Sequence, residues 1–176
     1  ILPGTKIDQL YINGERQPMA RYPNAQIGKN VFDSWDLSHN AIFDSLADVL
    51  LPSRIAKWKQ PEGGYVHAMH ESLWGDMHWL IKGKDKNNTL LMEGGWQNNR
   101  PSKMHPVFRM VENIFEELDA PGEWYLNEAT HKLFYYPKNG NINDAKVEIV
   151  RLPHLIEING TIENPVTNIN FKGFKT

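Results

Sequence analysis

Short runs of alternating apolar and polar residues recur along the chain, and most are bounded by Gly, Asn or Pro. Residues 65–71 and 77–82 are two such runs with Gly75-Asp76 between them, and 89–92 is a third. Aromatic and β-branched side chains at this period fit a half-buried pleated surface, and glycine beside a polar residue favours a turn. The pattern predicts a hairpin followed by a third strand.

The N-terminal part of the chain carries a strong hairpin signal. Asn13-Gly14 separates residues 10–12 from 15–22, and these two residues accept the positive φ values that a two-residue type I′ turn requires. Pro18 cannot donate to a sheet ladder, so it is expected to place the second strand at an edge or a bulge.

The C-terminal part of the chain contains the remaining strand-like runs. Residues 123–126 and 132–137 are rich in aromatic residues and predict a second hairpin with a longer turn. Alternating or apolar runs follow at 146–152, 155–158 and 166–174, separated by Asn-Gly and Asn-Pro breaks.

A period close to that of a helix is found in two places. Residues 42–59 carry a helical apolar stripe that is interrupted at Pro52, which predicts two short helices. Residues 106–118 fit a helix, and residues 107–114 within them also fit a strand. We favour the helix for this second segment.

The expected fold is therefore mainly β, an antiparallel β-sandwich or barrel-like domain with two or three short helices. The side chains on the apolar parity of their strands should be mostly buried, because one face of each strand must cover the core. These are Trp79, Ile81, Trp124, Leu126, Phe134, Tyr136, Val147 and Ile149.

Composition narrows the functional classes. Among 176 residues, 19 Lys and Arg stand against 21 Asp and Glu, a net charge of −2, so neither nucleic acid nor an anionic membrane is an expected partner. The longest apolar run is too short to span a bilayer. The chain has no cysteine, which removes disulfides, thiolate ligands and cysteine nucleophiles. It begins without Met or a signal segment, so we expect a piece of a longer protein.

Common catalytic motifs do not occur in the sequence. It has no phosphate-binding glycine loop, no Gly-x-Ser-x-Gly and no His-Glu-x-x-His. Glu116, Glu117, Asp119 and Glu123 lie close together, and glycosidases use paired carboxylates, but acidic residues around a helix end and a turn are usually solvated. We predict no catalytic pair and no cofactor.

The stretch 63–105 holds four of the seven histidines and three of the six tryptophans. Within it, Gly94-Gly95 precedes Trp96, Gln97, Asn98, Asn99 and Arg100. An indole face can stack on a pyranose, while amide and guanidinium groups match its hydroxyls. The alternative is a core tryptophan followed by a polar turn, since tryptophan is highly buried on average.

The histidines of this stretch invite comparison with a zinc site. On a helix His67, His70 and Glu71 would share one face, but the residues favour a strand, where positions 67 and 70 point to opposite faces. We therefore predict no metal site. If Glu71 opposes Met77 in the hairpin, His70 lies opposite His78 on one face.

The candidate ligand-binding residues follow from these two observations. They are Trp96, Gln97, Asn98, Asn99, Arg100, His70, His78 and Trp74.

Several segments together resemble a known family. These are LYINGERQPMARYPN, RIAKWKQPEGGYVHAMHESLWGDMHW, EGGWQNNR and, most specifically, ENIFEELDAPGEWYLNEATHKLFYYP. They resemble large bacterial proteins with right-handed parallel β-helices, of the glycoside hydrolase type. The resemblance covers nearly the whole chain.

The resemblance implies an architecture and a location. Residues 1–165 would be a β-rich inserted or accessory domain, and residues 166–176 would begin the parallel β-helix. The family's catalytic carboxylates would lie in later coils, so no catalytic residue is carried over to this chain. The parent protein would be periplasmic, secreted or on the cell surface.

Two functions follow for the chain itself. One is an accessory domain of a carbohydrate-active enzyme that contacts glycan, with the rest of the β-helix chain as its other partner. The alternative is a structural cap for the β-helix, whose end exposes backbone and apolar side chains and needs a cover but no ligand.

Overall fold

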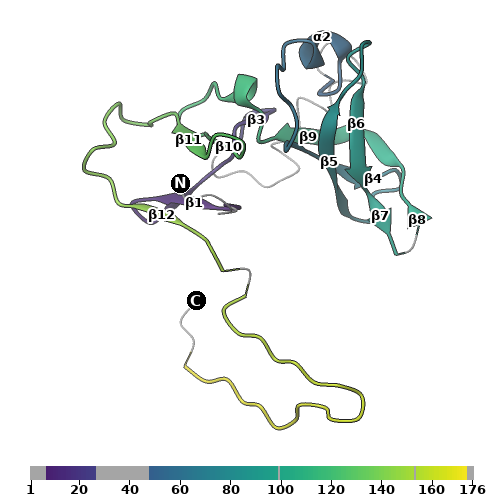
Figure 1. The fold of residues 1–176 in the computed structure, drawn as a ribbon, viewed down its shortest axis with the longest axis vertical. Helices are drawn as coiled ribbons and strands as arrows, with labels where there is room; N and C mark the ends of the chain where they lie inside the picture. The colour runs from purple at the N-terminus through teal and green to yellow at the C-terminus, as the bar shows by residue number, and fades with distance from the viewer. Residues whose placement is uncertain (1–6, 27–47, 99, 153, 174–176) are drawn as a thin grey trace.

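The computed structural model of the chain describes residues 7–26, 48–98, 100–152 and 154–173 (Figure 1). The strands are β1 (Leu10–Ile12), β2 (Glu15–Gln17), β3 (Arg21–Tyr22), β4 (Tyr65–His70), β5 (Asp76–Lys84), β6 (Leu90–Gly94), β7 (Trp96–Gln97), β8 (Arg100–Pro101), β9 (Met104–Glu112), β10 (Trp124–Asn127), β11 (Lys132–Tyr135) and β12 (Val147–Ile149). The described helical elements are α2 (Pro52–Ile55) and the 3₁₀ turn η4 (Phe115–Glu117). None of these helices is long enough to cross a membrane.

The largest unit is a five-stranded antiparallel sheet in the order β3-β9-β4-β5-β6. Smaller antiparallel sheets are β12-β1-β2, β10-β11 and β7-β8. The expected mainly-β, antiparallel character is therefore confirmed. The finer description as a sandwich or barrel stays a prediction.

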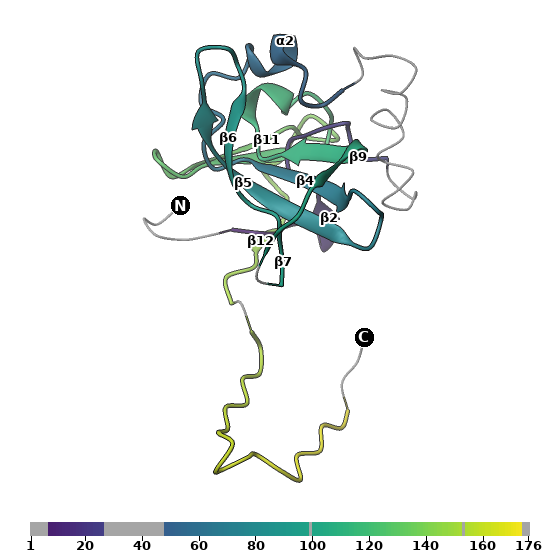
Figure 2. The same ribbon diagram turned by 90° about the vertical axis from the view of Figure 1, so that its right-hand side faces the viewer.

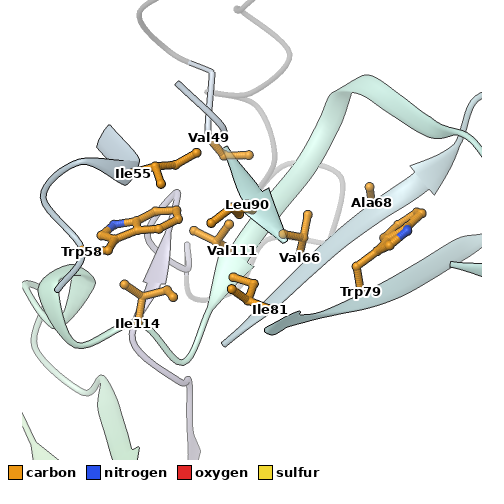
Figure 3. Close-up of a cluster of buried hydrophobic side chains, with 10 residues drawn as sticks. All are labelled: Val49, Ile55, Trp58, Val66, Ala68, Trp79, Ile81, Leu90, Val111 and Ile114. Carbon is orange, nitrogen blue, oxygen red and sulfur yellow. The ribbon is translucent and has the colours of Figure 1, made fainter. Parts of the chain in front are cut away.

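One apolar core covers the inner face of the five-stranded sheet (Figure 3). Val66 of β4, Trp79 and Ile81 of β5, and Val111 of β9 point into it because they share the same strand parity. Trp58, which follows α2, closes one side of the core. The other buried members of this core are Val49, Ile55, Ala68, Leu90 and Ile114.

A second core lies between the three-stranded sheet and the β10-β11 hairpin. Leu10, Trp124 and Leu126 are buried in it, and Leu133 and Tyr135 pack against them. A parallel bridge between Met19 and Trp124 joins this region to the segment that leads into β3.

The N-terminal hairpin forms as the sequence predicts. Asn13 and Gly14 have φ values of 52° and 81°, the left-handed region that a type I′ turn demands. Strand β2 ends at Gln17, immediately before Pro18, as the missing amide donor of proline requires.

The predicted helix over 106–118 is wrong. Residues 104–112 are strand β9, which pairs with β3 on one side and β4 on the other. Val111 faces the first core, while Met110 and Phe108 pack with Met69 in a separate cluster, and both sides are at least partly covered. A central strand covered on both faces loses the alternation that would separate it from a helix.

The predicted helix pair over 42–59 is only partly within the described residues. The first predicted helix begins at residue 42, and most of it lies outside the described residues. The second corresponds to α2, which begins at Pro52 instead of being interrupted by it. Proline at the first position of a helix loses no hydrogen bond, because that amide has no partner inside the helix.

Four of the eight side chains predicted to be buried are buried: Trp79, Ile81, Trp124 and Leu126. Ile149 is partly buried, and the prediction is wrong for Phe134, Tyr136 and Val147, which are exposed.

The pairing of β10 with β11 explains the error in the second hairpin. Trp124 lies opposite Tyr135 and Leu126 opposite Leu133, so the inward residues of β11 are the odd-numbered ones. Phe134 instead packs edge-on against Phe115, with ring centroids 5.2 Å apart. A shift of one residue moves every side chain of a strand to the other face.

The C-terminal segment, residues 154–173, runs away from the sheets as an extended arm in both views (Figures 1 and 2). The predicted strands at 155–158 and 166–174 pair with no described strand. Their apolar residues are exposed: Leu155, Ile156, Ile158, Val166, Ile169 and Phe171. No parallel β-helix is present among the described residues.

Candidate functional site

A row of polar side chains crosses four strands on the outer face of the five-stranded sheet, opposite the core. Arg21 of β3 lies across from Glu112 of β9, and His67 of β4 lies across from His78 of β5. Asp76 lies two residues before His78, so both side chains leave β5 on the same face. The pairing of the sheet thus gathers these residues from four separate parts of the sequence.

The members of this row contact one another directly. Nε2 of His67 lies 2.6 Å from Oε1 of Glu112, and the rings of His67 and His78 meet edge to face with centroids 4.2 Å apart. Nε2 of His78 lies 3.2 Å from Oδ2 of Asp76. The imidazoles therefore stand between two carboxylates.

The charge state of Glu112 fixes the hydrogen bond to His67. Burial acts to raise the pKa of Glu112, but the hydrogen bond and charge of His67, with the charges of Arg21 and His78, outweigh it and hold the pKa below its ordinary value. Glu112 is then a carboxylate at neutral pH and accepts a hydrogen bond from the Nε2–H of His67.

The polar row opens into a cleft of about 490 Å³ between the outer face of the sheet and the segment around β2. Arg16 and Met19 form part of its far wall. Nη2 of Arg21 is buried and has no hydrogen-bond partner among the described residues, while its Nε donates to the carbonyl of Pro23 at 2.7 Å. The cleft can therefore hold a polar ligand.

The register of the β4-β5 hairpin contradicts the predicted pairing of His70 with His78. His67 is the residue opposite His78, and the two strands end their pairing at Met69 and Asp76. His70 lies an odd number of residues from His67, so its side chain leaves the other face of β4. The expectation that positions 67 and 70 point to opposite faces is confirmed.

His70 instead supports the turn between β4 and β5. Its Nδ1 accepts the amide of Ser72 at 2.9 Å, and its ring stacks on Trp74 with the planes 3° apart and the centroids separated by 4.8 Å. Leu73 holds a positive φ of 61°, which is strained for a residue with a branched side chain. The turn presents Trp74 to solvent, with 69% of its surface exposed.

The hairpin of β7 and β8 carries the other predicted residues. Gly95 has a φ of 67°, and a Cβ there would collide with the indole of Trp79, so the backbone crosses the core tryptophan only because residue 95 is glycine. Trp96 follows with 61% of its surface exposed, and Gln97 lies opposite Arg100. The alternative of a core tryptophan at position 96 is wrong.

The remaining residues of this loop are placed as follows. Asn98 is exposed at the turn with a φ of 53°, and Arg100 is exposed on β8. Asn99 lies outside the described residues.

The turn that carries Trp74 precedes Asp76 at the start of β5, and the hairpin that carries Trp96 follows Gly94, which lies opposite Trp79 near the same end of β5. Figure 1 shows β7 and β8 at the end of the sheet away from α2. The amide of Glu71, in the β4-β5 turn, donates to the carbonyl of Lys103 at 3.0 Å, and the amide of Ser102 donates to Gly95 at 2.7 Å. These bonds join the turn that carries Trp74 to the hairpin that carries Trp96. Backbone hydrogen bonds therefore connect the two segments that carry most of the predicted binding residues, whereas His78 lines the cleft.

Sequence reasoning missed the roles of Arg21, Glu112 and His67. Arg21 belongs to a two-residue strand, and Glu112 was expected in a helix, so neither could be placed beside a histidine. One signal in the sequence pointed to this face of the sheet. Asp76 and His78 are two residues apart, so on a strand their side chains share one face.

The acidic group between residues 116 and 123 is less solvated than predicted. Glu117 and Glu123 are buried, with 6% and 1% of their surfaces exposed. Glu117 accepts the indole N–H of Trp58 at 2.7 Å and pairs with Arg54 at 3.3 Å. These contacts give the buried carboxylate a structural role in covering the first core.

Comparison with known proteins gives a single kind of match. No family model matches the chain, and no curated protein matches it. A solved structure named glycoside hydrolase is similar, with a TM-score of 0.56 and 20% sequence identity over 92% of this chain. The chain spans 29% of that protein. The fold of this chain is thus similar to one part, less than a third, of the solved structure.

Proposed function

We propose that this chain is an accessory domain of a carbohydrate-active enzyme and that it contacts glycan through the aromatic end of its five-stranded sheet. The observation that carries the proposal is the exposure of Trp74 and Trp96 at one end of one sheet. Exposed apolar residues that are scattered singly need no explanation, whereas exposed apolar residues grouped in one place mark binding surfaces.

The chemistry of this surface suits a sugar. Trp74 is already stacked on His70, which leaves its other face to solvent. Gln97, Asn98 and Arg100 belong to the same short hairpin as Trp96, and their side chains offer donors and acceptors for hydroxyl groups. An aromatic platform with a few polar groups that fix orientation is the usual form of a site for a polar organic ligand.

The larger setting is part of the same proposal. The similarity to a glycoside hydrolase supports a parent that acts on carbohydrate. Residues 1–165 then form the accessory domain, and residues 166–176 begin a parallel β-helix that carries the catalytic carboxylates. A parent of this kind acts on polymers outside the cytoplasm, in the periplasm, in the medium or on the cell surface.

Glycan binding is tested by calorimetry or affinity electrophoresis against a broad panel of plant and host oligosaccharides. For a ligand found in this way, Trp96→Ala and Trp74→Ala should each weaken binding about tenfold, or about 1.4 kcal/mol, because each removes a stacking surface. Leu91→Ala is the control, since Leu91 is also an exposed apolar residue and lies near the other end of β6. Equal losses in all three variants would contradict a defined binding surface.

The alternative function is a structural cap, and the C-terminal arm favours it. Eight large apolar side chains between residues 152 and 171 are exposed: Leu152, Leu155, Ile156, Ile158, Ile162, Val166, Ile169 and Phe171. Under this hypothesis the arm pairs with the β-helix of the parent. The complete parent should then resist protease cleavage within 154–173, while the isolated chain is cut there, and the glycan panel should show no binding.

A further inference from the structure

Three side chains with metal-ligand chemistry meet on the outer face of the five-stranded sheet. Asp76 and His78 alternate on β5 and share a face, and His67 lies directly opposite His78 on β4. One donor atom from each of the three residues lies within 4.8 Å of the other two. We propose that His67, Asp76 and His78 bind one divalent first-row transition metal ion, of which zinc is the representative.

The donor set determines the kind of metal. Two imidazole nitrogens and one carboxylate oxygen suit zinc and its neighbours, whereas calcium and magnesium take sets made wholly of oxygen. With metal–ligand bonds of about 2.0 to 2.1 Å, tetrahedral donors lie about 3.3 Å apart, so the side chains must close by about 1.5 Å at most. Asp76 and His78 are free to do so, because 44% and 58% of their side chains are exposed.

His67 is the rigid member of the set, because Glu112 holds it. With Nδ1 on the metal, Nε2 keeps its proton and donates to Glu112, which is the usual carboxylate support of a metal-bound histidine. With Nε2 on the metal, Oε1 of Glu112 lies within reach of the same ion. In both arrangements the metal gains from the negative charge of Glu112.

The site also has room for a ligand of its own. The three residues line the cleft of about 490 Å³ with Arg16 and Arg21. Three protein ligands leave the fourth tetrahedral position for water or for an oxygen of a bound molecule. This site is independent of the proposed glycan surface, because His70 and the exposed tryptophans take no part in it.

The test is a calorimetric titration of the whole metal-stripped chain with zinc chloride. We expect one ion per chain, with the affinity reduced at least tenfold in His78→Ala and in His67→Ala. His78→Ala decides the test, because His78 is exposed and its loss should not affect folding. His70→Ala is the matched control on the opposite face of β4 and should bind as tightly as the unmodified chain.

Three results would overturn the proposal. They are a titration without one-to-one saturation, unchanged affinity in His78→Ala, and an equal loss in His70→Ala, which would place zinc elsewhere.

Glu112→Gln tests the supporting role of this carboxylate. We expect a loss of about 10-fold to 100-fold in zinc affinity, the range found when such supporting groups are removed. The melting temperature of the metal-free variant shows whether its fold is retained. Unchanged zinc affinity in a folded Glu112→Gln chain would show that Glu112 does not support the metal.

Discussion

Replacing Trp124 with alanine is expected to lower the free energy of unfolding by about 3 to 5 kcal/mol. Trp124 is fully buried beside Leu10 and Leu126 in the second core. Its indole N–H donates to the carbonyl of Gln17 at 3.0 Å, so the change empties a large volume and also removes a buried hydrogen bond.

Urea unfolding followed by circular dichroism measures this loss, and Trp96→Ala is the matched control. Both changes remove an indole, but Trp96 is 61% exposed. We expect Trp96→Ala to alter the free energy of unfolding by about 1 kcal/mol or less. A loss of several kcal/mol at position 96 would make the β7-β8 hairpin part of the scaffold and remove the basis for its role in glycan binding.

This contrast also shows what local patterns predict well. The strands that carry Trp79 and Trp124 were placed correctly because each has clear alternation and a turn signal beside it. The turn at Asn13-Gly14 was predicted from two residues alone, since few residues accept positive φ. Features set by neighbouring residues in the chain are therefore visible in the sequence.

Features set by pairing between distant segments were not visible. The register that places His67 opposite His78 depends on a turn of six residues, from His70 to Gly75, whose geometry includes a left-handed Leu73. No propensity favours a leucine there. An error of three residues in this register moved the predicted histidine pair from His67 to His70 and concealed the cleft.

The same distinction between local and long-range features applies to the candidate functional residues. Trp96, Gln97 and Arg100 lie together because they are close in sequence, and the prediction of an exposed loop needed no tertiary information. Arg21 and Glu112 face each other only because β9 is a central strand, which the sequence pattern did not distinguish from a helix. A site assembled from four strands needs the sheet order before it can be recognised.

Glu123 should make the stability of this chain depend on pH. Its side chain is buried beside the turn at residues 119–122, where Oε2 accepts the amides of Asp119 and Ala120, both at 3.2 Å. Burial raises the pKa of Glu123 from its ordinary 4.5 to about 7, against the lowering effect of those two amides. The native chain therefore binds a proton at Glu123 that the unfolded chain releases between these pH values.

The sign of the effect follows from proton linkage. Because the native state binds more protons between about pH 4.5 and 7, the contribution of Glu123 is fully present below that range. This contribution to the free energy of unfolding decreases as the pH rises to about 7. Above that pH, Glu123 causes no further change in stability. The whole shift corresponds to about 3 kcal/mol, of which roughly 2 kcal/mol falls between pH 5 and pH 8, because part of the change already occurs below pH 5.

Glu123→Gln isolates this contribution, since an amide stays neutral at every pH. Between pH 5 and pH 8 the free energy of unfolding of the unmodified chain should fall by about 2 kcal/mol more than that of the variant. Urea unfolding at both pH values measures the difference, and titration of the histidines cancels because both chains contain them. Glu128→Gln, an exposed carboxylate just after β10, should leave the difference unchanged. Parallel pH profiles for the unmodified chain and Glu123→Gln would show that Glu123 is ionised in the native state throughout, with Arg21 as a counter-charge.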